Sequence, residues 1–214
     1  MPTPTEILQT LAAIANEQAA LAITWHVLIA VTAIGILASW RPTKKGAAVV
    51  SIPLLSVSIL AWAYKNPFNG LVFLLFAIAF VVIGLRRPSE TVDRAPGWAA
   101  IAGLILILFG WVYPHFLGAG SWLRYLYKAP AGLIPCPTLS LVTGFALLAN
   151  GFSSRAYSVT LGMLGLFYAL FGAFRLGVRT DLVLGLGAAA LLVLALTLGF
   201  SASQPKPSVG NPQA

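Results

Sequence analysis

Hydrophobic residues in this chain form long runs, separated by short segments that carry Pro, Gly, Asn or basic residues. The runs approach the roughly 20 residues that a helix needs to cross about 30 Å of hydrocarbon, and they lack the polar alternation of a transmembrane barrel strand. We count seven, at 20–40, 47–64, 70–85, 98–116, 138–152, 157–174 and 182–200. The pattern predicts an all-α, polytopic integral membrane protein, a bundle of about seven transmembrane helices. The short fifth run makes the count six if it is re-entrant.

The two ends of the chain follow other patterns. In residues 5–18, apolar side chains recur three and four positions apart, with polar ones between them. This spacing predicts a short amphipathic helix that lies along a membrane surface. The end of the chain is polar and rich in Pro, which predicts disorder. We therefore expect one transmembrane helical domain over residues 1–200 and a disordered polar tail over residues 201–214.

The composition supports lipid as the solvent of this chain. Hydrophobic residues make up 59% and charged residues 8% of the 214 positions, whereas an average soluble domain carries about 25% charged residues. The formal net charge is +8, but the basic residues lie singly or in pairs between apolar runs. That placement is typical of membrane-protein loops and gives no basic patch for nucleic acid, so we expect the bilayer as partner and no nucleic acid.

Basic residues also predict the orientation, because they are enriched in cytoplasmic loops. With seven spans, the side that holds the N-terminus carries five of them, and the opposite side carries eight. We therefore expect the N-terminus outside and the C-terminus in the cytoplasm. The five are Lys65, Arg124, Lys128, Arg175 and Arg179, and the eight are Arg41, Lys44, Lys45, Arg86, Arg87, Arg94, Arg155 and Lys206.

With this topology, the residues of greatest chemical interest fall on the outer side. His26 lies about two turns inside the first helix, His115 follows the fourth helix, and Cys136 opens the fifth. The connection at 118–134 is too polar and too rich in glycine to span, and its residues 121–128 predict a short interfacial helix. Both histidines and the only cysteine therefore belong to one face of the membrane.

Three interpretations of this face compete. His26, His115 and Cys136 are ligand types for a haem or a transition metal, but no spacing motif joins them, so no cofactor is predicted. Cys136 alone, at a helix N-terminus between two prolines, suits a redox sensor or a substrate contact. The competing interpretation of Cys136 is a small buried residue in a rigid turn. The third interpretation is a substrate path, an outward-facing vestibule lined by Tyr113, His115, Arg124, Lys128, Cys136 and Thr138.

Acidic residues and catalytic motifs give little support to any particular function. No acidic residue lies clearly inside a run, which argues against a proton- or cation-coupled transporter. We expect the turn with Arg175, Arg179 and Asp181 to be solvated.

Small residues at 165–173 and 185–190 predict close helix packing. No nucleophile, metal or phosphate-binding motif of a known enzyme class is present, so the balance lies against an enzyme, without deciding the question.

A set of short motifs resembles a known family. The chain has an early Glu6, Trp25 near the start of the first run, Tyr113-Pro114, then Ala129-Pro130, and finally Pro-Cys-Pro-Thr at 135–138. In this it resembles a family of small bacterial membrane proteins, catalogued as a domain of unknown function, across nearly its whole length. The resemblance implies a multi-pass protein of the bacterial inner membrane and supplies no activity.

Two functions from different classes follow from these patterns. The first is a small permease or channel-like protein for a small solute or ion, with an outward-facing vestibule. The alternative is a non-catalytic membrane subunit or accessory protein, which packs on other subunits or on itself through its small-residue stripes. A haem- or metal-binding membrane protein ranks third.

Overall fold

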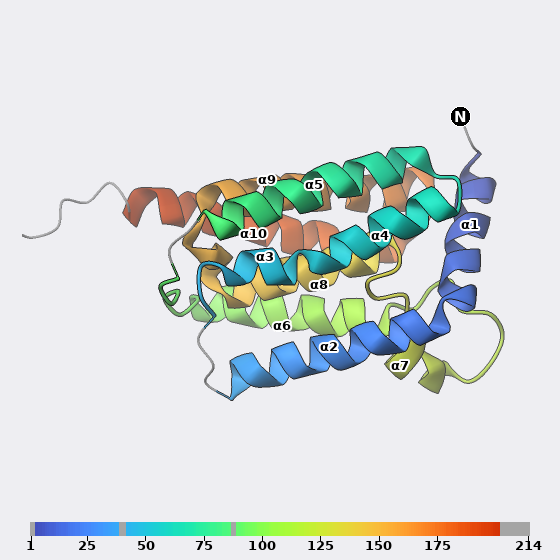
Figure 1. Ribbon diagram of the computed structural model, residues 1–214, viewed down its shortest axis with the longest axis horizontal. Helices are drawn as coiled ribbons and strands as arrows, with labels where there is room; N and C mark the ends of the chain where they lie inside the picture. Colours follow the sequence, from blue (N-terminus) through green and yellow to red (C-terminus); the bar gives the residue numbers. More distant parts are fainter. Residues whose placement is uncertain (1–2, 39–41, 87–88, 202–214) are drawn as a thin grey trace, which may run out of the picture.

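The computed structural model describes residues 3–38, 42–86 and 89–201, and within these ranges the chain is all-helical. Most helices run lengthwise through the molecule, and α1 (Pro4–Glu17) crosses one end of them (Figure 1). No strand forms among the described residues, and the only β-type pairing there is an isolated bridge between Thr43 and Thr91. The architecture is a helical bundle with a helix across one end, which we call the α1 end.

The helices follow the hydrophobic runs. Five stretches are long and apolar enough to cross a membrane: Ala19–Ile36 in α2, Gly46–Ala63 across α3 and α4, Pro67–Leu85 in α5, Arg155–Arg175 in α9 and the turn that continues it, and Arg179–Leu198 across the turn before α10 and most of α10. The helices α6 and α8 are apolar but shorter. The lengthwise helices are α2 (Ala19–Leu37), α3 (Gly46–Val50), α4 (Ile52–Ala63), α5 (Pro67–Leu85), α6 (Gly97–Val112), α8 (Pro135–Leu148), α9 (Arg155–Leu170) and α10 (Leu182–Ser201).

The connection between α6 and α8 contains the expected short helix. It begins with a 3-10 turn at Trp122–Arg124 and continues as α7 (Tyr125–Lys128). It lies at the α1 end, beside the start of α2 (Figure 1). At the opposite end, two connections are joined by a Lys44–Glu90 salt bridge of 2.6 Å between Nζ and Oε2. The expected tail falls at residues 202–214, outside the described residues.

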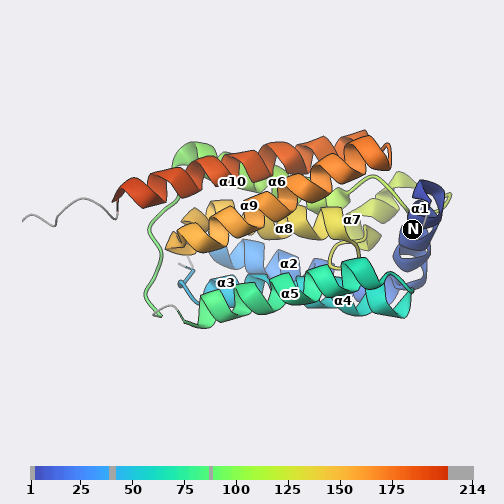
Figure 2. The same ribbon diagram turned by 90° about the horizontal axis from the view of Figure 1, so that it is seen from above.

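Helix α8 occupies the centre of the bundle. It lies between the α9–α10 pair and the α4–α5 pair (Figure 2) and packs most closely on α6. Of its residues, only Cys136 and Leu148 are not fully buried. Its 14 residues span about 21 Å at 1.5 Å per residue, and the buried segments on both sides of it are not α-helical. Such backbone is tolerated at membrane depth only when protein surrounds it.

Prolines explain where several helices begin and end. The run at 98–116 gives a helix that ends at Val112, because Pro114 cannot continue it. The run at 138–152 gives a helix that begins earlier, at Pro135, because proline is favoured in the first turn. The run at 47–64 breaks at Ser51, where Pro53 starts a new helix.

The small-residue stripes pack inside the bundle. A Cβ on Gly165 of α9 would lie 2.9 Å from the Cβ of Ala188 of α10, and a Cβ on Gly185 of α10 would lie 3.3 Å from the Cβ of Ala169 of α9. On α10, a Cβ on Gly187 would overlap the side chain of Leu106 of α6. These glycines let the helices of one chain approach closely, so this stretch of the stripes is not a free surface for another subunit.

Candidate functional site

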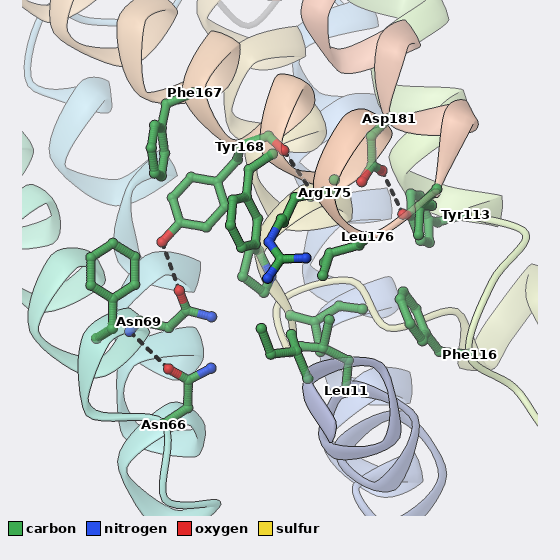
Figure 3. Close-up of a pocket in the computed structure, with 18 residues that line it drawn as sticks. Leu11, Asn66, Asn69, Tyr113, Phe116, Phe167, Tyr168, Arg175, Leu176 and Asp181 are labelled. Atoms are coloured by element: carbon green, nitrogen blue, oxygen red, sulfur yellow. Dashed lines mark hydrogen bonds between the residues drawn. The ribbon is translucent and has the colours of Figure 1, made fainter. Parts of the chain in front are cut away.

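A cavity of about 330 Å³ lies at the α1 end of the bundle. Its walls come from α1, the start of α5, the segment after α6, the start of α8, the end of α9 and the turn before α10. Most of the side chains that line it are apolar or aromatic, and a few polar groups converge among them (Figure 3). This composition is typical of a small-molecule site.

The most deeply buried polar pair of this cavity is Asp181 with Tyr113. Asp181 precedes α10 and is 2% exposed, and Tyr113 follows α6 and is 1% exposed. The Tyr113 hydroxyl donates a hydrogen bond of 2.5 Å to Asp181 Oδ1, and the two side chains point toward each other in Figure 3. No basic nitrogen of the described residues lies within 4.0 Å of this carboxylate, so the aspartate is buried without an ion-pair partner.

The expectation of a solvated turn is therefore wrong for Asp181, whereas Arg175 and Arg179 are exposed as expected. The chain after α9 folds back on itself, because the Val178 amide donates to the Gly172 carbonyl at 2.9 Å. This contact carries Asp181 into the bundle, where a Cβ on Gly172 would overlap its Oδ2. Asp181 stands in the 3-10 turn before α10, at the edge of the apolar stretch Arg179–Leu198 and not clearly inside it.

Cys136 lies next to this pair, in the first turn of α8. Its thiol faces the Tyr168 carbonyl at 3.9 Å, and its side chain is partly exposed although it sits inside the bundle, because it lines the cavity. The only cysteine in the chain thus belongs to the wall of the cavity.

A second polar pair lies across the cavity. The Tyr168 hydroxyl of α9 donates to Asn69 Oδ1 of α5 at 2.9 Å, as Figure 3 shows. Asn69 belongs to the first turn of α5, and its backbone N–H donates a hydrogen bond to Asn66 Oδ1 at 3.1 Å. The α5 cap thereby fixes the asparagine that Tyr168 contacts, and the pair holds α5 and α9 together beside the cavity.

The end of α9 widens into a π-helix at Phe171–Arg175. The Leu176 amide bonds to the Phe171 carbonyl at 3.2 Å, five residues earlier. Single π-turns are frequent at functional sites. This one places the Phe171 ring and Gly172 on the cavity wall and the exposed Arg175 at its rim.

Helix α1 closes the end of the cavity with Ile7 and Leu11. Asn16 fixes this helix to the connection after α6: its Nδ2 donates to the Phe116 carbonyl at 2.7 Å, and its Oδ1 accepts from the Gly118 amide at 2.9 Å. The predicted amphipathic helix therefore packs its apolar face on the bundle and forms part of the site.

Two of the predicted vestibule residues, Tyr113 and Cys136, line the cavity. His115 lies next to it, with ring centroids 5.8 Å from Tyr113, but is not part of the wall. The structure does not bring the other three to the cavity. Arg124 donates to the Ala119 carbonyl at 2.8 Å, Lys128 Nζ lies 5.6 Å from the Tyr127 ring centroid, and Thr138 is buried and donates to the Ile134 carbonyl at 2.7 Å.

The three candidate metal ligands do not form one group. In the described part of the chain, no cluster of three or more His, Cys, Asp or Glu side chains could hold a metal ion. His26 is 3% exposed, and its Nδ1 and Nε2 lie 2.8 and 3.0 Å from the carbonyl oxygens of Ala22 and Trp111. Both ring nitrogens are occupied: the Nδ1 contact lies within α2, and the Nε2 contact joins α2 to α6.

Sequence reasoning missed five polar residues of the cavity: Asn66, Asn69, Tyr168, Arg175 and Asp181. Only Asp181 carries a signal in the sequence, as the one acidic residue after Asp93. It lies directly before an apolar run, where a short turn leaves it little distance from the hydrocarbon.

Comparison of the chain with known protein families, curated proteins and solved structures gives no match. The resemblance to the bacterial family stays a prediction.

Proposed function

We propose that this chain is a multi-pass protein of the bacterial inner membrane with seven spans. Five stretches have the length and hydropathy for this. The shorter α6 and α8 run lengthwise beside them (Figure 1), and other helices bury α8. The distribution of basic residues supports an N-terminus outside and a C-terminus in the cytoplasm, which puts the α1 end on the outer face.

Two matched cysteine variants test this topology. In a Cys136→Ser background, Ser121→Cys lies at the α1 end and Ser89→Cys at the opposite end, and both serines are exposed. A membrane-impermeant maleimide added to intact spheroplasts should label Ser121→Cys at once, and Ser89→Cys only after permeabilisation. The reverse order would overturn the orientation, and equal labelling of both would overturn membrane insertion.

We propose further that the chain acts as a small permease whose binding step takes place in the cavity at the α1 end. The observation that carries this proposal is the buried Asp181–Tyr113 pair at the wall of an apolar cavity of about 330 Å³. An ionisable residue buried at membrane depth is costly, and such residues mark substrate or ion paths. A cavity of this size suits a small molecule.

The structure also changes the balance between the alternatives. The argument against a proton- or cation-coupled transporter was the absence of an acidic residue clearly inside a span, and Asp181, buried at the edge of the last apolar stretch, weakens it. The argument for an accessory subunit was the small-residue stripe, and glycines of that stripe pack inside the chain. Transport of a small solute or ion is therefore the function that the site supports best.

Uptake into proteoliposomes tests the permease. Three probes that cross lipid slowly and that differ in charge are suitable: phenyl β-D-glucoside, which is neutral and has an aromatic ring and hydroxyl groups, benzyltrimethylammonium and benzenesulfonate. We expect at least one to enter faster than into protein-free liposomes. Alkylation of Cys136 with N-ethylmaleimide should stop this uptake because the adduct fills the cavity, whereas a Cys136→Ser variant should keep transporting after the same treatment. If folded protein speeds none of the three, the permease is overturned.

A further inference from the structure

The rim of the cavity contains two large aromatic side chains that protein does not cover. Phe68 at the start of α5 is 59% exposed, and Phe167 of α9 is 48% exposed, and both line the cavity. They come from two neighbouring helices that the Tyr168–Asn69 hydrogen bond joins. The cavity therefore has an apolar side opening between α5 and α9, on the flank of the bundle.

The depth of this opening indicates what lies outside it. Phe167 precedes Arg175, the last residue of the π-helix, by eight positions, which is about 12 Å along a helix at 1.5 Å per residue. Arginine near a helix end extends its charge to the membrane surface. With Arg175 at that surface, Phe167 lies within the apolar layer, so the flank opening faces lipid tails.

The polar groups of the wall define the second half of the ligand. A carboxylate has about four lone-pair sites, and two side chains donate to Asp181, the Tyr113 hydroxyl at 2.5 Å and, more weakly, the Cys136 thiol, so acceptor sites remain. A buried acceptor without a donor costs free energy, and an O–H or N–H group of a ligand would supply one. A ligand that arrives through lipid tails carries no fixed charge, because a charged group is costly in hydrocarbon.

We infer that the cavity takes its ligand sideways from the outer leaflet, between α5 and α9, and that this ligand is a neutral, amphipathic molecule whose hydroxyl or amide group donates a hydrogen bond to Asp181. The inference rests on the proposed function, since it names the substrate class of the same cavity. It predicts a ligand with an apolar body that packs on the aromatic wall and one polar group at its inner end.

Protection of Cys136 from N-ethylmaleimide provides the test, in lipid nanodiscs that hold the full chain. The probes are 2-naphthol, which has a donor, 2-methoxynaphthalene, which has the same rings and oxygen without a donor, and trimethyl(2-naphthyl)ammonium, which carries a fixed charge. Half-protection by 2-naphthol should need about ten-fold less probe than by either of the others, since a hydrogen bond to a charged group is worth about 1.5–3 kcal/mol. Equal protection by the methoxy compound, or stronger protection by the cation, would overturn the ligand class.

Two variants separate the role of Asp181 from a general loss of structure. Asp181→Leu should abolish the advantage of 2-naphthol. Asp93→Asn, an exposed acidic residue in the connection before α6, should leave it unchanged. If Asp181→Leu does not fold, Tyr113→Phe tests the same point, because it frees one more acceptor site and should raise the affinity for 2-naphthol. An unchanged affinity in Tyr113→Phe, with the protein folded, would contradict direct donation to Asp181.

The route of access has its own measurement. Lipid-soluble N-ethylmaleimide should alkylate Cys136 at least ten-fold faster than a charged methanethiosulfonate sulfonate, relative to their rates with an exposed cysteine at Ser121→Cys. Equal relative rates would show access from water and overturn lateral access. The uptake of the probes that cross lipid slowly decides the permease separately, so a failed ligand class and a failed permease give different results.

Discussion

Two regions of the bundle use close packing in opposite ways. Where α6 meets α8, the backbones touch: a Cβ on Gly103 would lie 2.7 Å from the Gly144 carbonyl oxygen, and a Cβ on Gly144 would lie 2.7 Å from the Gly103 carbonyl oxygen. At the α1 end, α8 begins beside a cavity of about 330 Å³. The same helix thus takes part in one of the tightest contacts of the chain and in its candidate site.

The difference has a physical origin in the helix ends. In the middle of α6 and α8, both backbones are regular helices, so the volume of the side chains between them sets the distance between the helix axes. Glycine has no side chain, and the two helices can therefore approach closely. At the α1 end, Pro114 stops α6, a π-helix widens α9, and a turn brings back Asp181. Irregular backbone cannot pack as closely, and the space that remains holds the buried polar groups.

The largest expected effect is at the tight contact. Gly103→Leu would force apart two backbones in the centre of the bundle, and overpacking of this kind costs about 1–3 kcal/mol and occasionally more. We expect a strong loss of folded protein, measured by thermal unfolding of the detergent-solubilised chain. The control is Gly97→Leu on the same helix, because a Cβ at Gly97 meets no atom within 4 Å. Equal loss in both variants would contradict the close approach of α6 and α8.

An intermediate effect is expected at the cavity. Tyr113→Phe removes the hydroxyl that donates to the buried Asp181 at 2.5 Å, and leaving a buried polar group without its partner costs about 1–3 kcal/mol. The free energy of unfolding should fall by this amount, measured in mixed micelles. Tyr127→Phe, at a tyrosine that is 45% exposed, should change it little. An unaltered stability in Tyr113→Phe would argue against the buried pair.

The smallest effect is expected at the start of α1. The Thr3 amide donates to Glu6 Oε2 at 2.6 Å, and this hydrogen bond holds the pKa of the Glu6 carboxyl below its usual value of 4.5. The carboxylate therefore stabilises the capped first turn fully above pH 4.5, and this contribution is lost as the pH falls through the lowered pKa.

Hydrogen exchange of residues 3–10 checks this prediction. Protection of these amides should fall slightly as the solution is acidified below pH 4.5 in the wild type. In Glu6→Gln it should be lower at neutral pH and should not change with pH over that range. A wild-type protection that rises on acidification would contradict the capping contact.

Sequence patterns predicted the elements of this fold well, because hydrophobic length depends on local composition. Each predicted run gives a helix or two helices in line, and the amphipathic segment gives α1. Of the candidate site, the pattern selected Tyr113 and Cys136, which flank the connection between α6 and α8 and lie at helix ends. Arg124 and Lys128 lie within this connection and Thr138 lies in α8 after it, but nothing in the spacing tells which side chains turn toward a common cavity.

The sequence by itself determined that the chain is all-helical and where its turns lie, since long apolar runs and prolines act within a few residues of their own position. Only the tertiary structure decided that α8 is central, that glycines of the small-residue stripe face other helices of this chain, and that Asp181 is buried beside Tyr113, 68 positions away in the sequence. These features depend on which helix faces join. In a chain whose runs are apolar on nearly every side, hydropathy does not distinguish one face from another.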